Sequence, residues 1–361
     1  MDRRNFLQTL TALASTSPLA IFASEEHRIA ISSKGLISPS ETTNDLLQLT
    51  EAAWLPPKIG VIAIGSAGGA ILKEQRANLP CLSRAIAIDT NPFGLRRTDA
   101  DVKIQIGDGR KRYIEPTAAR FLANAKREEI ASAVSGLDLV FILAGMGGAT
   151  GTGISPIVAE VTHDARISTI AATIIPFEFE GRRRQQIAEV GLRSISRRVN
   201  ASIPLSNELF ARSADDGTLI DRVLAEVPKA FTHLYRGVVN NLSGPGLVGI
   251  DFEDVRVVLS QRAGQAAFGF GAASGENSGK MAALNAIASP LLGQARLQKA
   301  TAVLLTIEGR PEILKMREIS NIMNTLNGVC PEALLMVGAI PNPTQVEDCS
   351  VTILANGIPL A

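Results

Sequence analysis

Apolar segments alternate with helical patterns between residues 58 and 217. Each apolar segment is a continuous run, which is typical of a strand buried on both faces of a sheet. The segments between them have helical periodicity, as in PTAARFLANAKREEIASAV (116–134). Strands that alternate with helices predict a parallel sheet covered by helices on both faces. The predicted strands are IGVIAIG (59–65), RAIAID (84–89), LDLVFILAG (137–145) and STIAATIIPF (168–177).

A long helical pattern, TLIDRVLAEVPKAFTHLYRGVVNNL, follows this region and ends at the break SGPG (243–246). The remainder contains the strand patterns ATAVLLTIEG (300–309) and SVTILANG (350–357), together with two or three helices. The pattern predicts an α/β protein in which one long helix joins two α/β domains. The expected boundaries are 58–217 for the first domain, 218–242 for the central helix and 243–361 for the smaller second domain.

Residues 1–57 differ from the rest of the chain. They contain the pair Arg3-Arg4 in DRRNFLQ, and a mildly apolar stretch follows at 10–23. This order resembles a twin-arginine export signal, although Phe22 stands where a cleavage site favours a small residue. A short basic, amphipathic extension is the alternative. The polar block after this stretch is typical of a linker.

Composition argues against several classes of function. The 361-residue chain has a formal net charge of +1 and 4% aromatic residues. Both values argue against a nucleic-acid partner, because such proteins use basic surfaces and aromatic stacking. No apolar run reaches the roughly 20 residues that span a bilayer, so we expect no transmembrane span. The three cysteines and three histidines are scattered, and we expect no metal site made by the protein alone.

The strongest chemical signal is AGMGGATGTG (144–153), directly after a predicted strand and directly before the helical pattern ISPIVAEVT. Its five glycines allow sharp turns and close approach to a ligand, and successive N–H groups can surround an anion. The following helix adds its positive end, and Thr150 and Thr152 add hydroxyl donors. No Walker-type lysine is present. The pattern predicts a phosphate-binding loop, with a tight glycine turn that holds no ligand as the alternative.

This loop is close to the GGGTGTG signature of the tubulin/FtsZ family of polymerising GTPases, with Ala149 in place of one glycine. The resemblance covers residues 58–358 and implies that the chain binds GTP or GDP, with Mg²⁺ accompanying the nucleotide. It also implies a head-to-tail protofilament of the chain with itself and hydrolysis at the subunit interface. The loop residues implied to bind nucleotide are Gly147, Gly148, Ala149, Thr150, Gly151, Thr152 and Gly153.

Four further segments resemble nucleotide-contacting motifs of the family. IAIGSAGGAIL (62–72) is similar to its first glycine-rich loop, with Ala70 where the family usually has Asn, and does not fit the G-x-G-x-x-G pattern of dinucleotide enzymes. AIDTNPFGL (87–95) is similar to AINTDAQAL, PFEFEGRRR (176–184) to PFxFEGxxR, and PLSNELF (204–210) to the PND loop. The first segment implies nucleotide contacts by Gly65, Ser66, Gly68, Gly69 and Ala70, and the second places Asp89 and Thr90 beside the phosphates or the sugar. Glu180 and Asn207 are implied to contact the sugar, and Arg184 to flank the nucleotide as a fixed cation.

GIDFEDV (249–255) resembles the NxDFxDV loop of the family, which enters the nucleotide pocket of the next subunit, with Gly249 in place of Asn. By this resemblance Asp251 and Asp254 would be catalytic, orienting the attacking water or a cation beside it, as phosphoryl transfer to water requires. Carboxylates spaced i, i+3 share one face of a helix. The alternative is that both aspartates cap the following helix.

Three departures from the family bear on function. Pro228 and Lys229 stand where an acidic or amide pair reads the guanine edge, and a lysine offers only donors, so guanine specificity is open. DGRKRYIEP (108–116) replaces a glycine-rich loop, and its cations at 110–112 either reach the γ-phosphate or form a solvated loop. The chain ends at Ala361 without the linker and anchor peptide of FtsZ, which indicates a divergent paralogue.

Two functions follow from these patterns. The first is an FtsZ-like GTP-binding protein that polymerises head to tail and hydrolyses GTP, in a process such as cell division. The second is a hydrolysis-deficient paralogue that acts as a structural or regulatory partner of a true FtsZ. We expect a cytoplasmic protein, because nucleoside triphosphates are cytoplasmic. Export or membrane association through the twin-arginine-like start is the alternative.

Overall fold

The computed structural model describes part of the chain. The twin-arginine-like start, most of the predicted linker and the cations at 110–112 lie outside the described residues. All elements named below belong to one unit, Pro56–Ala361. The described residues are 56–109, 115–215, 217–244, 246–261 and 265–359.

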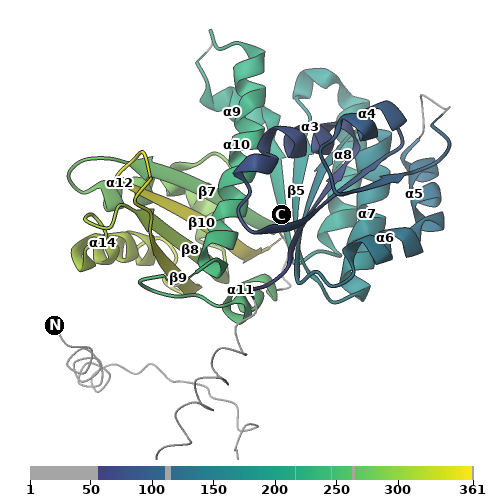
Figure 1. The fold of residues 1–361 in the computed structure, drawn as a ribbon. Coiled ribbons are helices and arrows are strands. Elements are labelled where there is room, and N and C mark those ends of the chain that lie inside the picture. Colours follow the sequence, from purple (N-terminus) through teal and green to yellow (C-terminus); the bar gives the residue numbers. More distant parts are fainter. Residues whose placement is uncertain (1–55, 110–114, 216, 245, 262–264, 360–361) are drawn as a thin grey trace, which may run out of the picture. The chain divides into compact units, whose positions relative to one another are not determined.

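A parallel sheet forms the centre of the first domain, as predicted (Figure 1). Its strand order is β3-β2-β1-β4-β5-β6, and every neighbouring pair is parallel. β1 is buried along its whole length, which explains its unbroken apolar sequence. The strands are β1 (Ile59–Ile64), β2 (Leu82–Asp89), β3 (Val102–Gln105), β4 (Leu139–Gly145), β5 (Ser168–Ile175) and β6 (Ala201–Ser206).

Helices cover both faces of this sheet. They are α3 (Gly65–Gln75), α4 (Pro92–Arg97), α5 (Pro116–Ala125), α6 (Arg127–Val134), α7 (Ala149–Asp164), α8 (Arg182–Ser196), α9 (Asn207–Ser213) and α10 (Ile220–Val239). Val61 and Ala63 of β1 pack in a core with α3 and α10, whereas Ile62 and Ile64 pack in a core with α5, α6, α7 and α8. The helix predicted at 116–134 is two helices, because the backbone leaves helical geometry at Lys126.

The second domain has a mixed sheet in the order β7-β10-β8-β9. β10 is antiparallel to β7 and β8, and β8 is parallel to β9. Helices α12 and α14 pack on one face of it in a separate core, and the predicted strand patterns correspond to β8 and β10. The elements are α11 (Phe252–Leu259), β7 (Gln265–Ala273), α12 (Ser278–Ala288), α13 (Gln294–Leu297), β8 (Ala302–Gly309), α14 (Met316–Asn327), β9 (Leu334–Pro341) and β10 (Cys349–Ile358).

Helix α10 joins the two sheets, as the long helical pattern predicted. The Tyr235 hydroxyl donates to the carbonyl oxygen of Pro80 (2.9 Å), and its ring lies 4.9 Å from that of Phe141 in β4. One face of α10 thus packs on the first domain, while His233 stacks on Phe270 of β7 with 3.6 Å between ring centroids. The α/β class and the joining helix are confirmed, and the boundary residues stay a prediction.

Candidate functional site

The order of the parallel strands reverses between β1 and β4, and the helices that follow these two strands cover opposite faces of the sheet. In open α/β sheets, ligands bind at such a switch point, beyond the carboxyl ends of the strands. Gly65 has a φ of +71°, which lets α3 begin directly after β1. The candidate site is therefore the crevice beyond the ends of β1 and β4.

The phosphate loop is shorter than the sequence indicated, because α7 begins at Ala149. Residues 150–153 therefore lie in the first turns of the helix and not in a loop before it. Gly148 precedes the helix and provides no side-chain cap, so the first amide N–H groups have no partner within the helix. Together with the positive end of the helix dipole, these amides form an anion site that requires no side chain.

The two threonines of this segment hold the loop in shape. The hydroxyl oxygen of Thr152 is buried and accepts from the backbone N–H of Gly147 (3.0 Å). The hydroxyls of Thr150 and Thr90 are hydrogen-bonded to each other (2.8 Å), which ties the end of β2 to the start of α7. We predicted hydroxyl donors to a ligand, and the structure gives both side chains partners within the protein.

The glycines of the segment fall into two groups. A Cβ on Gly151 would collide with the carbonyl oxygen of Gly145, and a Cβ on Gly153 would collide with that of Pro116. These two glycines are therefore required by close packing of the backbone. At Gly148, by contrast, a Cβ would meet no atom within 4 Å. The prediction that glycine allows a ligand to approach therefore fits Gly148, and packing explains the others.

The first glycine-rich segment is also explained mainly by packing. A Cβ on Gly68 would collide with the carbonyl oxygen of Leu143 in β4, and one on Gly69 would lie 2.6 Å from the hydroxyl of Thr98. Both glycines therefore let α3 approach the sheet and α4 closely. Ser66 is exposed at the start of α3.

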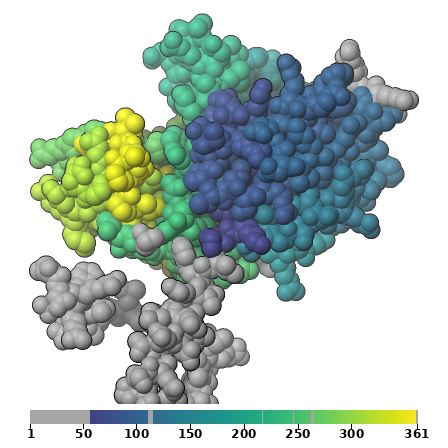
Figure 2. Space-filling view, viewed as in Figure 1, coloured from purple at the N-terminus to yellow at the C-terminus, as the bar shows by residue number. Residues whose placement is uncertain are grey.

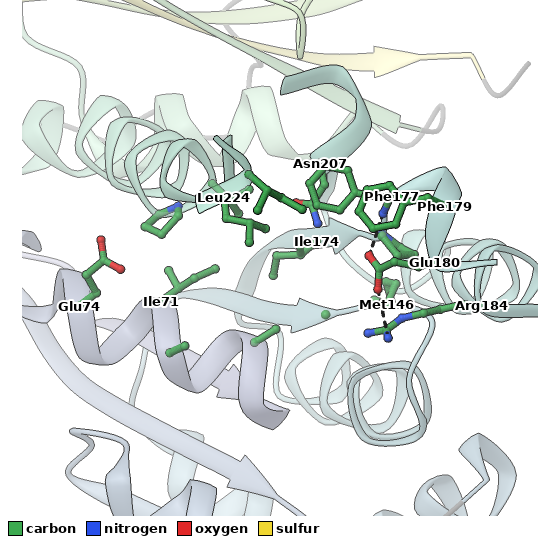
Figure 3. Close-up of a pocket in the computed structure, with 17 residues that line it drawn as sticks. Ile71, Glu74, Met146, Ile174, Phe177, Phe179, Glu180, Arg184, Asn207 and Leu224 are labelled. Carbon is green, nitrogen blue, oxygen red and sulfur yellow. Dashed lines mark hydrogen bonds and ion pairs between the residues drawn. The ribbon is translucent and has the colours of Figure 1, made fainter. Parts of the chain in front are cut away.

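A pocket of about 550 Å³ is lined by Gly145 and Met146, shortly before the start of α7, whereas the predicted residues 147–153 are not among its lining residues (Figure 3). Its walls come from one face of α3, the segments after β4 and β5, and the first half of α10. Figure 2 shows the teal-green residues of α9 and the start of α10 projecting beyond the purple residues of the first domain. Most lining side chains are apolar, and the polar ones are Glu74, Glu180, Arg184 and Asn207.

Glu180 and Arg184 form the polar corner of the pocket nearest to the loop. One carboxylate oxygen of Glu180 lies 3.1 Å from Arg184 Nη1, and the other accepts from the backbone N–H of Phe177 (2.9 Å). A Cβ on Gly147 would lie 2.6 Å from Arg184 Cγ, so this side chain passes directly over the loop. The rings of Phe177 and Phe179 stack at 4.8 Å beside the pair.

Asn207 lines the pocket from the first turn of α9. Its side chain is 6% exposed, and within the described residues its Oδ1 has no hydrogen-bond donor. A buried acceptor without a partner costs about 1–3 kcal/mol, so the site is suited to a ligand that brings a donor. A sugar hydroxyl supplies such a donor.

Asp89 ends β2 and is buried, but it is not among the side chains that line the pocket. Its carboxylate accepts from the backbone N–H of Asn91 (3.0 Å). Burial raises the pKa of Asp89 above its usual range, and this backbone bond offsets the rise only in part. The predicted contact of Asp89 with phosphate or sugar stays a prediction.

Lys229 does not line the pocket. Its ammonium group lies 2.9 Å from a carboxylate oxygen of Glu226 on the outer face of α10, whereas Pro228 lines the pocket. The helix runs through Pro228, and the missing N–H of this residue leaves the carbonyl of Leu224 without its usual helical partner. The predicted contact of Lys229 with the nucleotide stays a prediction, and the structure places its side chain outside the pocket.

Of the wall that α3 contributes, the sequence predicted Ala70 but not Ala67, Ile71 or Glu74. Ala67, Ala70, Ile71 and Glu74 all line the pocket. They are spaced i, i+3, i+4 and i+7, which is one face of a helix. This spacing was visible in the sequence, but which face of α3 turns away from the sheet depends on the packing of Gly68.

Comparison with known proteins agrees with this geometry. Residues 58–215 match the model of the tubulin/FtsZ family GTPase domain, and residues 264–359 match that of the FtsZ family C-terminal domain. The chain belongs to the tubulin/FtsZ family. A cell division protein FtsZ from Pseudomonas putida is 32% identical over 319 residues, covering 87% of this chain and 79% of the relative. That of Pseudomonas aeruginosa is 34% identical over 306 residues, covering 83% and 77%.

Solved structures of the tubulin/FtsZ family share the fold. An FtsZ dimer from M. jannaschii has 27% identity and a TM-score of 0.75, covering 88% of this chain and 92% of the other. CetZ2 from Haloferax volcanii, solved as a GTPgS-bound protofilament, has 19% identity and a TM-score of 0.71, covering 84% and 94%. At this identity CetZ2 supports the fold alone.

In this family member the two candidate catalytic aspartates belong to the start of α11, and α11 lies at the opposite end of α10 from α9 (Figure 1). The 20-residue helix α10 is about 30 Å long at 1.5 Å per residue. Asp251 and Asp254 form a capping box for α11: Asp251 Oδ1 accepts from the N–H of Asp254 (2.9 Å), and Asp254 Oδ2 accepts from that of Asp251 (3.1 Å). The capping alternative therefore describes them within one subunit, and each retains one oxygen outside the cap.

Among the residues that the structure describes, no helix has the length and apolar character to cross a membrane.

Proposed function

We propose that the chain binds GTP and GDP in this pocket, with Mg²⁺ beside the phosphates, and hydrolyses GTP between copies stacked head to tail. The observation that carries the proposal is the uncapped first turn of α7, which follows the pocket-lining residues Gly145 and Met146 in a family of GTPases. Phosphate oxygens are the anions that such a helix start binds best.

The residues present fit a nucleotide. The space in front of Gly148 is open where a phosphate would lie, and Asn207 Oδ1 is a buried acceptor in need of a donor. In this arrangement the amides of α7 hold the phosphates, Asn207 takes a sugar hydroxyl, and Glu180 holds Arg184 over the loop as a fixed cation. Bound GTP supplies the γ-phosphate that water attacks.

A second copy of the chain completes the site in this proposal. Glu180 is already bound to Arg184 and to the backbone, so it is poorly placed to act as a base. Asp251 and Asp254 lie far from the pocket of their own subunit, on the exposed start of α11, with one free oxygen each. A head-to-tail contact brings the partner's Asp254 to the phosphate end, where it orients water.

Turnover tests this arrangement directly. Turnover per chain should rise steeply with protein concentration, because each site needs two chains. Asp254→Ala should keep nucleotide affinity and lose turnover, with Glu253→Ala on the same turn of α11 as the control. Equal turnover in Asp254→Ala and Glu253→Ala, or turnover per chain that is independent of concentration, would contradict hydrolysis between subunits.

A second function is favoured by the capping box and by Ala70, Gly249 and Lys229, none of which supplies the polar contact usual at its position. In this alternative the chain retains nucleotide without hydrolysing it and co-assembles with a true FtsZ as a structural or regulatory partner. Tight nucleotide retention with negligible phosphate release distinguishes it. We place either activity in the cytoplasm, where GTP is available, and relate it to cell division because the similar proteins carry that name.

A further inference from the structure

The pocket has a second polar end that no motif marks. Glu74 lines the pocket at the end opposite to Glu180 and Arg184 (Figure 3). Around it the walls are apolar, made by Ile71 of α3 and Pro228 of α10 together with their neighbours. Among the described residues that line this end, Glu74 is the one ionisable side chain.

The distance along α3 matches a nucleoside. Ala67 packs against Gly145 at the phosphate end, since a Cβ on that glycine would lie 2.8 Å from Ala67 Cβ. Glu74 lies seven residues further along the same helix face, which is about 10 Å at 1.5 Å per residue. A sugar and a purine together cover this span. A nucleotide whose phosphates bind α7 therefore directs its base towards Glu74.

The exposed carboxylate of Glu74 is held in place by a chain of hydrogen bonds whose Thr232–Gln75 link is buried. The Oε1 of Gln75 accepts from the Thr232 hydroxyl (3.0 Å) and from Asn78 Nδ2 (3.1 Å), which fixes the orientation of this amide. Its Nε2 then donates to Glu74 Oε1 (2.9 Å). No described residue donates to Glu74 Oε2, so that oxygen is open to a ligand.

We infer that Glu74 selects guanine by accepting from the N1–H and the 2-amino group of the base. A carboxylate only accepts hydrogen bonds, and guanine presents two donors side by side on this edge. Adenine presents an acceptor at N1, which the carboxylate repels. Glu74 is exposed in the free chain, and a base seated between the apolar walls would shield the contact from water and strengthen it. Glu74 thereby provides the acceptor that Lys229, on the outer face of α10, does not. This inference rests on the proposed nucleotide site.

The test is calorimetric titration of the full chain with GTP, ITP and ATP. Inosine lacks the 2-amino group, so ITP reports one donor and GTP two. We expect the unsubstituted protein to bind GTP about 10-fold more tightly than ITP and about 100-fold more tightly than ATP, as differences of one and two hydrogen bonds to a charged group predict. Glu74→Gln should weaken GTP about 30-fold or more while ATP binds as well or better, because an amide also donates.

Three further variants distinguish selection of the base by Glu74 from a general effect on the folded structure. Glu226→Gln removes a carboxylate that pairs with Lys229 outside the pocket, and it should leave the GTP to ATP ratio unchanged. Thr232→Val removes the hydrogen bond that orients the Gln75 amide. While the variant remains fully folded, its GTP to ATP affinity ratio should fall by about 3- to 10-fold, as expected for loss of one positioning hydrogen bond. Glu74→Asp keeps the charge but shortens the side chain and should give an intermediate ratio.

The outcomes distinguish this inference from the proposed function. If GTP binds and the GTP to ATP ratio is the same in Glu74→Gln as in the unsubstituted chain, Glu74 does not read the base and the nucleotide site stands. If the unsubstituted chain binds none of the three nucleotides, the proposed function fails first.

Discussion

The two ends of the pocket are built from different parts of the chain. At the end proposed to hold phosphate, the groups available to a ligand are backbone amides at the start of α7, and Gly151 and Gly153 are needed so that the backbone can pack. At the other end the binding surface consists of side chains, Glu74 on α3 and Leu224 and Pro228 on α10. An amide is present whatever the side chain, whereas a side-chain contact is lost with a single substitution.

This difference explains where the chain departs from its family. At the phosphate end Ala149 replaces a glycine and still provides its N–H. At the other end Ala70 and Pro228 line the pocket and change the chemistry of its surface, and Lys229 lies outside the pocket. In the proposed site, phosphate binding by backbone amides tolerates side-chain substitution, whereas contact with the base depends on side chains, and we infer that Glu74 supplies it.

The largest expected effect separates the two kinds of glycine at the phosphate end. Helix propensity alone predicts that Gly151→Ala stabilises α7 by about 1 kcal/mol. Because its Cβ would collide with the carbonyl oxygen of Gly145, we instead expect a loss of more than about 3 kcal/mol of unfolding free energy, the upper range of overpacking. Urea unfolding measures it, and an increase in stability would contradict the packing role.

Gly148→Ala is the matched control on the same turn. Its Cβ meets no protein atom, so the free protein should be within about 0.5 kcal/mol of the unsubstituted chain, as for substitutions away from packed positions. Its methyl group occupies ligand space, and nucleotide affinity should fall by about 10-fold or more through overpacking against phosphate. Unchanged affinity would show that the space in front of α7 holds no ligand.

The sequence predicted the centre of the fold better than its edges. β1, β4 and β5 were recognised because strands buried on both faces are continuous apolar runs. β3 and β6 were not among the predicted strands, and they are the two edges of the sheet. β3 is four residues long and partly exposed, and β6 contains Pro204, which disfavours a strand assignment.

In the candidate site, too, some residues could be predicted from the sequence and others could not. The motif residues Ala70, Glu180, Arg184 and Asn207 were predicted and line one pocket. Glu74 could not be predicted, because its role depends on the face that α3 presents and on the buried chain from Thr232 through Gln75. A motif marks the residues that a family repeats, and Glu74 belongs to none of the motifs that this sequence resembles.

The second-largest expected effect is a pH dependence of stability, which comes from His233 where α10 packs on β7. His233 stacks on Phe270, and burial, with help from Arg236, lowers the pKa of His233 from 6.5 to about 4. Between these pH values the unfolded chain gains a proton that the folded chain does not. The free energy of unfolding should therefore fall as pH falls from about 6.5 to about 4, by up to about 3 kcal/mol, and it should not change through this group above that window.

Urea unfolding at pH 7 and at pH 4.5 measures this dependence, with Glu226, Lys229 and Glu347 as the other charged groups near the ring. His233→Gln should remove most of the slope, and the exposed His163→Gln should retain it. Backbone amides do not titrate. Acid should therefore weaken the packing of His233 on β7 before it affects the start of α7. An equal slope in His233→Gln and in the unsubstituted chain would contradict the assignment.

The smallest expected effect comes from replacing Asn207, whose side chain lies between the two ends of the pocket. Asn207 Oδ1 is buried without a donor, and replacing it by leucine, which has a similar volume, removes the unsatisfied acceptor. Asn207→Leu should therefore leave the nucleotide-free protein as stable or about 1 kcal/mol more stable, while nucleotide binds about 10-fold less tightly because the sugar hydroxyl loses its acceptor. Unfolding without nucleotide and calorimetry with GDP measure the two quantities on the same sample. A variant that loses stability and keeps its affinity would mean that Asn207 holds the fold of α9, and the sugar would then have to be bound from the Glu180 side alone.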